Sequence, residues 1–167
     1  FVNNTREKLK FIKDDIRIIT KVIKVGSAPQ KLKYEIIIKS DKYDLVLPIE
    51  WLRSEFAVNE NKDLIITTGE LNYNCDGCDK EYQIAPELMQ IDLTKDNPKL
   101  ENIGIRGKHF FIINNHLYFH QYFEEFAYDE KYNLYRVPLK EWSNTELVFR
   151  QSFRKCFVFP NEDILFA

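Results

Sequence analysis

Residues 108–119, KHFFIINNHLYF, predict the fold class of the chain. The two arms of this stretch, KHFFII and HLYF, are rich in aromatic and β-branched residues, which favour strands. Asn114 and Asn115 stand between the arms, and asparagine tolerates the backbone conformation that a tight turn requires. The stretch therefore predicts two antiparallel strands joined by a short turn.

Segments of the same design lie on both sides of this hairpin. Residues 124–139, EEFAYDEKYNLYRVPL, place the charged turn DEKYN between two β-prone arms, and residues 33–47 contain the polar break KSDKYD. The density of Ile and Val in residues 9–25 also favours strands over a helix. The last strands are expected at 147–149, 156–159 and 164–166.

We therefore predict a mostly β fold of antiparallel sheets built from hairpins, with one or two short helices. Such sheets form a sandwich, a barrel or a partial propeller-like arrangement. Pro48 is expected to end a strand, and residues 49–56 (IEWLRSEF) fit one or two helical turns. Residues 85–107 contain DNP and two glycines, so we expect mainly loop there, interrupted at most by short strands or a short helix.

The length of 167 residues suits a single domain, 1–167. One internal similarity is present, because DKYDLVLPIEW (residues 41–51) resembles EKYNLYRVPLKEW (residues 130–142). Two similar β halves, about 9–85 and 100–167, would explain it. Coincidence remains the alternative, since both segments have the ordinary sequence features of a hairpin.

The composition argues against several classes of protein. The hydrophobic share of 44% is too high for a disordered chain. The net charge is -2, with Lys+Arg 24 against Asp+Glu 26, so the basic excess of a nucleic-acid-binding protein is missing. No apolar run is long enough to span a membrane.

The opening residues bear on the compartment. The chain begins at Phe1 rather than at Met, and its polar opening FVNNTREK would suit a short tether behind a removed leader. We therefore expect a periplasmic or otherwise exported protein, with a cytoplasmic location as the alternative.

The stretch NCDGCDK, residues 74–80, holds Cys75 and Cys78. Asp76-Gly77 predicts a hairpin tip, which places the two cysteines at facing strand ends. In an oxidising compartment they would form a disulfide that fixes the tip, and elsewhere they would be free thiols. A redox-active pair is disfavoured, because thioredoxin-type CxxC needs a helix N-terminus and the flanks predict strands.

Zinc is the alternative cofactor, although we expect none. Cys75, Cys78, His116 and His120 read as C-x2-C followed by H-x3-H, a set of ligands for structural zinc. The gap between the two halves is much longer than in a zinc finger. On a helix the two histidines would share a face, whereas on a strand they would lie roughly 13 Å apart. A zinc-stabilised β module that contacts nucleic acid is therefore the second hypothesis.

A hydrolase is the third hypothesis. Ser152, His109 and Asp92 could supply a triad, but no G-x-S-x-G motif supports them and no glycine-rich phosphate loop is present.

The first hypothesis is a non-enzymatic domain that binds a partner protein. Phe and Tyr are concentrated in residues 108–136, beside arginines and acidic turns, as in a binding surface with a polar rim. An exported or lipid-anchored protein of the immunity or inhibitor type, which neutralises its partner, would fit. The candidate partner-binding residues are Asp76, Asp79, Tyr122, Glu124, Glu125 and Arg136.

Overall fold

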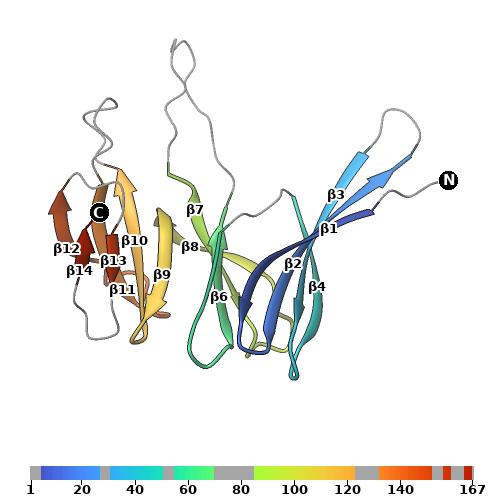
Figure 1. Ribbon diagram of the computed structural model, residues 1–167, viewed down its shortest axis with the longest axis horizontal. Helices are drawn as coiled ribbons and strands as arrows, with labels where there is room; N and C mark the ends of the chain where they lie inside the picture. Colours follow the sequence, from blue (N-terminus) through green and yellow to red (C-terminus); the bar gives the residue numbers. More distant parts are fainter. Residues whose placement is uncertain are drawn as a thin grey trace, which may run out of the picture.

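The strands of the computed structural model form three four-stranded antiparallel sheets, each made of consecutive strands (Figure 1). The structure describes residues 5–26, 31–50, 55–69, 85–122, 132–151, 156–158 and 164–166. The first sheet contains β1 (Thr5–Lys13), β2 (Ile16–Val25), β3 (Lys31–Lys39) and β4 (Asp44–Ile49). The middle sheet contains β5 (Phe56–Val58), β6 (Leu64–Thr68), β7 (Glu87–Asp92) and β8 (Leu100–Arg106). The third sheet contains β9 (Lys108–Ile113), β10 (His116–Tyr122), β11 (Tyr132–Pro138) and β12 (Glu146–Gln151), and a separate two-stranded sheet contains β13 (Cys156–Val158) and β14 (Ile164–Phe166).

The hairpin expected in residues 108–119 is confirmed. Strand β9 ends at Ile113 and β10 begins at His116. Asn114 and Asn115 both have positive φ, 47° and 60°, as a type I′ turn requires. The turn matches the right-handed twist of the two strands and sets their register, in which His116 faces Ile113.

The β character of the prediction is confirmed, with differences in detail. Pro48 does not end a strand but lies inside β4, opposite Glu35. The sheet tolerates this proline because β4 is an edge strand, where its missing N–H leaves no gap in a ladder. The described residues contain no helix and hence none that is long and apolar enough to cross a membrane. The helical turn expected in residues 49–56 falls mainly on 51–54, which are not described.

Residues 85–107 form two strands, β7 and β8, rather than mainly a loop. The middle sheet is buried on both faces, so β7 directs Leu88 to one side and Ile91 to the other. Such a strand lacks the regular apolar–polar alternation that reveals a strand with one solvated face. The two glycines had favoured a loop, but Gly104 lies within β8, where it has a φ of 75°.

The middle sheet is the centre of the hydrophobic core. Consecutive residues of β6 alternate between two clusters, Ile65 packing with Ile16 and Ile36 of the first sheet. Ile66 packs with Leu117 of the third sheet, in the other cluster. Each face of the middle sheet therefore buries its apolar side chains against a neighbouring sheet. This burial is the main contribution to the stability of the stack.

The order of the strands makes the stack propeller-like. The strands run consecutively through each sheet, and the sheets follow one another along the chain. The first strands of the sheets are neighbours in space, since β5 contacts both β1 and β9. Propeller blades follow one another in the same way, so of the three predicted arrangements the partial propeller-like one resembles this stack most, and the described strands form no closed barrel.

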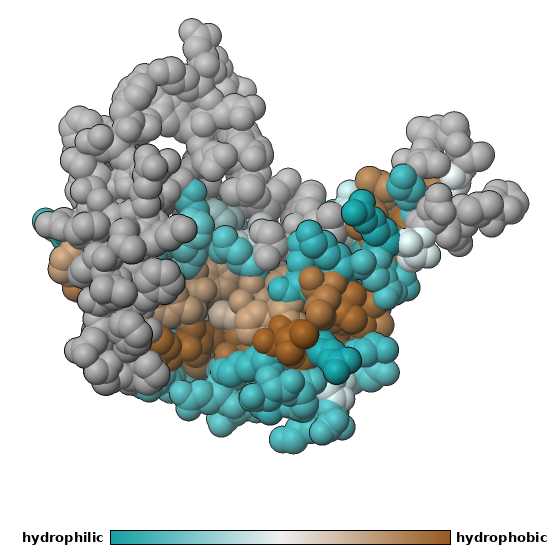
Figure 2. Space-filling model, viewed as in Figure 1, coloured by the Kyte–Doolittle hydropathy of each residue, from teal (hydrophilic) through white to brown (hydrophobic). Residues whose placement is uncertain are grey.

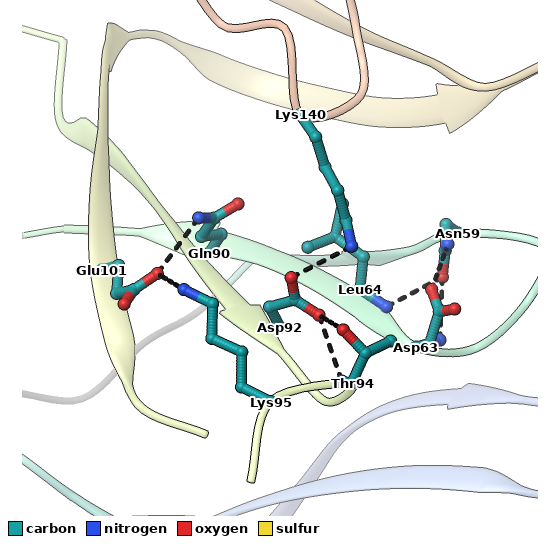
Figure 3. Close-up of polar contacts among 9 residues, drawn as sticks. All are labelled: Asn59, Asp63, Leu64, Gln90, Asp92, Thr94, Lys95, Glu101 and Lys140. Carbon is teal, nitrogen blue, oxygen red and sulfur yellow. Dashed lines mark hydrogen bonds and ion pairs between the residues drawn. The ribbon is translucent and has the colours of Figure 1, made fainter. Parts of the chain in front are cut away.

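Polar contacts at the turns join the sheets (Figure 3). Asp92, at the end of β7, accepts a hydrogen bond from Lys140 Nζ at 3.0 Å, and Lys140 follows β11 in the third sheet. Thr94 donates to the same carboxylate through its backbone N–H and its hydroxyl. Burial alone would raise the pKa of Asp92, but the hydrogen bonds from Thr94 and Lys140 hold it below its ordinary value. On the face shown in Figure 2, hydrophilic side chains of the described residues lie along this end, below a band of apolar surface.

The two faces of β6 give a test of the stack. We expect Ile65→Ala and Ile66→Ala each to lower the free energy of unfolding by about 2–5 kcal/mol, because each leaves a cavity in a different cluster. Leu32→Ala is the matched control, since Leu32 is 48% exposed, and should cost less than about 1 kcal/mol. Urea unfolding measures all three, and an Ile65→Ala protein as stable as the unmutated one would exclude the packing of the first sheet on the middle sheet.

Candidate functional site

The two ends of the strands carry connections of different length. At one end, short turns of neighbouring sheets contact one another, at 14–15, 40–43, 59–63, 93–99, 114–115 and 139–145. At the opposite end, β6 is joined to β7 through residues 69–86 and β10 to β11 through 123–131. We call this second end, where β5 and β9 begin, the loop end. Long connections held by a packed scaffold are where binding residues concentrate.

Three polar side chains from two sheets meet at the loop end: Glu55, His109 and His120. The backbone N–H of His109 donates to Glu55 Oε2 at 3.1 Å, and His109 Nδ1 lies 3.6 Å from Glu55 Oε1. The rings of His109 and His120 stand edge to face, with centroids 6.2 Å apart. We call these residues the Glu55–His109–His120 cluster, and it links the middle sheet to the third sheet.

His109 occupies a strained position in a β-bulge. The pairing of β9 with β10 shifts between Tyr118 and His120, so β9 carries an extra residue there. The φ of His109 at this bulge is 51°, a conformation that glycine adopts more readily. A non-glycine residue in this region costs on the order of 1 kcal/mol, and such strain is concentrated at functional sites.

Gly107 permits the close approach of β9 to β10. A Cβ at this position would lie 2.7 Å from Phe119 Cδ2 and 3.1 Å from the carbonyl oxygen of His120. Its N–H donates to the carbonyl of Pro86 at 3.0 Å, which ties the start of β9 to the middle sheet. A side chain here would displace the bulge and with it His109.

His120 is a buried neutral imidazole. Its Nδ1 lies 3.0 Å from the backbone carbonyl oxygen of His109, and because a carbonyl only accepts, Nδ1 carries the proton. Burial lowers the pKa of His120 below its ordinary value, and the bond to the His109 carbonyl opposes this effect without cancelling it. The cluster therefore combines a carboxylate, an exposed imidazole and a neutral imidazole, which suits hydrogen bonding to a partner.

Most of the residues predicted for partner binding fall in the sequence of the two long connections. Asp76 and Asp79 fall in the connection between β6 and β7, and Glu124 and Glu125 in that between β10 and β11. All four lie outside the described residues, as do Cys75 and Cys78, so the disulfide stays a prediction. Tyr122 is the last residue of β10, and its backbone pairs with Tyr132.

Arg136 lies apart from the loop end. It stands inside β11, opposite Tyr118, and its Nε donates to Glu146 Oε2 at 3.0 Å. Hydrogen bonds to Tyr118 and Glu146 hold the pKa of Arg136 above its usual value. The structure therefore gives Arg136 a role in the packing of the third sheet.

The two histidines of the alternative zinc site lie on one strand. His116 begins β10 and contacts the carbonyl oxygen of Asn114 at 2.9 Å, whereas His120 lies near the loop end. Along a strand, four residues span roughly 13 Å, too far for two ligands of one zinc ion. Within the described part of the chain, no three His, Cys, Asp or Glu side chains are grouped as a metal site.

The residues considered for a hydrolytic triad are separated. Asp92 is held by Thr94 and Lys140 at the end of the short turns. His109 lies at the loop end, where its backbone N–H and its imidazole contact Glu55 instead. Ser152 lies outside the described residues.

Glu55 was not found from the sequence. It lies 54 positions from His109, and no local motif surrounds it. The contact depends on the packing of β5 beside β9, which hydrophobic patterns do not specify. The only local sign was Gly107 directly before an aromatic strand, which is typical of a bulge or of a close backbone approach.

Acid should weaken the fold through His120. The unfolded chain binds a proton near pH 6.5, and the folded chain binds it only at lower pH. The stability that depends on a neutral His120 is therefore fully present above about pH 6.5, and it is lost as the pH falls towards the pKa of His120 in the folded chain. We expect His120→Asn to remove this part of the pH dependence in urea unfolding between about pH 7.5 and 5. His116→Gln is the control, and an equal change in both variants would contradict the assignment.

No family model, curated protein or solved structure matches the chain.

Proposed function

We propose that the protein is a non-enzymatic domain that binds a partner protein through its loop end. The observation that carries the proposal is the position of the two long connections, which both join strands at the end where the Glu55–His109–His120 cluster lies. The tightly turned opposite end and the doubly buried middle sheet supply the scaffold. Binding loops on a stable scaffold are the common arrangement in recognition proteins.

The chemistry of these connections points to a basic partner surface. Asp76 and Asp79 fall in one connection, and Glu124 and Glu125 in the other. Tyr122 precedes the second pair at the end of β10, and tyrosine is enriched among residues that dominate binding energy. Acidic groups beside an aromatic anchor would steer a basic surface into place and then bury apolar area.

Blockade is the form of binding that we favour. Acidic loops that enter the basic cleft of a partner enzyme would neutralise it, as an immunity or inhibitor protein does. An exported location would suit such a role. The partner is identified by its chemistry alone, a concave basic surface that admits the two connections.

A photo-crosslinking residue tests which end binds. Benzoylphenylalanine at Tyr122 should capture the partner in the native host, whereas the same residue at Glu60, in a turn of the opposite end, should not. Mass spectrometry of the crosslinked protein identifies the partner. Capture from Glu60 alone would place the binding surface elsewhere.

Charge reversal tests the acidic residues once the partner is known. We expect the variant with Asp76, Asp79, Glu124 and Glu125 all changed to Lys to bind about 10- to 100-fold more weakly, and added salt to speed its association instead of slowing it. The control carries Glu60→Lys and Asp96→Lys, two exposed acids of the short turns, and should bind normally. Equal affinities by calorimetry, or turnover by the isolated protein on a substrate panel, would contradict the proposal.

A further inference from the structure

The face of the β1–β4 sheet that points away from the middle sheet carries an apolar row. The row consists, in register across the four strands, of Leu9, Ile19, Ile37 and Val46. The neighbouring residues Ile18 and Ile36 are buried against the middle sheet, so the row lies on the opposite face. Leu9 and Val46, at the two edges, are 49% and 51% exposed. At the centre of the row Ile19 is half-buried and Ile37 is only 7% exposed, so the apolar surface that the row leaves open to solvent lies at its two edges.

On the opposite side of the stack, outward-facing residues of the third sheet are buried. On the third sheet, Leu117 and Phe119 pack towards the middle sheet, so Tyr118 points away from it. Tyr118 is nevertheless only 1% exposed, and Leu134, in the same small cluster, is 2% exposed. The outward face of the third sheet is therefore covered around Tyr118, whereas on the first sheet Leu9 and Val46 leave the two edges of the row accessible.

Charged rows of opposite sign border the apolar row. The row on one side contains, in register, Ile12, Arg17, Lys39 and Asp44. Its two cations exceed its one carboxylate, and neither cation forms an ion pair with any residue that the structure describes. The row on the other side contains Glu7, Lys21, Glu35 and Pro48. Here Lys21 Nζ lies 3.8 Å from each of the two carboxylates, so the row is negative overall.

We propose that this face binds a second copy of the chain in a symmetric dimer. A two-fold axis parallel to the apolar row lays the row of one copy on that of the other. The same operation places the positive row of each copy over the negative row of its partner. The face is thus complementary to itself in both hydrophobicity and charge, as an isologous interface requires.

The dimer leaves the proposed binding surface open. The interface lies on the face of a sheet, whereas the loop end lies at the ends of the strands. Both copies therefore present their loop ends, and the assembly would bind two partner molecules. This inference does not depend on the proposed function.

Sedimentation equilibrium of the full chain tests the dimer. We expect the unmutated protein to be dimeric at high concentration, and Val46→Lys to weaken the dimer about 30-fold or more, because it puts a charge into the apolar row. Leu32→Lys is the matched control, with similar exposure in the same sheet but on the other face, and should stay dimeric. Circular dichroism melts of both variants establish that they fold.

A charge exchange tests the direction of packing. Arg17→Glu with Lys39→Glu makes both charged rows of one variant negative, and Glu7→Lys with Glu35→Lys makes both rows of the other positive. Each variant alone should be monomeric, and an equal mixture should form a one-to-one heterodimer. A monomeric unmutated protein at every soluble concentration, a dimer indifferent to Val46→Lys, or variants that dimerise alone would each overturn the proposal.

Discussion

Burial of the middle sheet on both faces is the constraint on which the rest of the structure depends. A single four-stranded sheet with apolar residues on both faces cannot remain in water, so β5–β8 requires a sheet on either side. The first and third sheets meet this requirement, and β5 contacts both β1 and β9. The alternation of Ile65 and Ile66 between the two clusters is therefore the sequence feature that holds the three sheets together.

The hairpins could be predicted from the sequence because their signals are local. Asn114 and Asn115 supply the two positive φ angles of the turn, and the strands expected near the C-terminus appear at Cys156–Val158 and Ile164–Phe166. Residues 85–107 were expected to be mainly loop, because β7 is buried on both faces and shows no alternation, and because β8 contains Gly104 and follows the turn residues DNP. The number of sheets and their stacking could not be predicted, since they depend on which apolar faces meet in space.

For the candidate site, too, local features could be predicted from the sequence, whereas contacts between sheets could not. The acidic residues were chosen from the sequence, which predicted hairpins there, and the order of the strands places both connections that contain them at one end of the stack. Glu55 and the strained backbone of His109 were not predictable, because their contact joins two sheets across 54 positions. The positive φ of His109 and the burial of His120 both lower local stability, and both lie at the proposed binding end.

Native-state hydrogen exchange tests most directly whether the middle sheet is the structural centre. If it is, the amides of β6 and β7 open only when the whole protein unfolds, so they exchange slowest and their opening free energy equals that of global unfolding. The edge strands β4 and β12 should exchange faster, through local opening. Protection of β2 and β3 that exceeds that of β6 and β7 would contradict the account, because the first sheet would then be stable without the middle sheet.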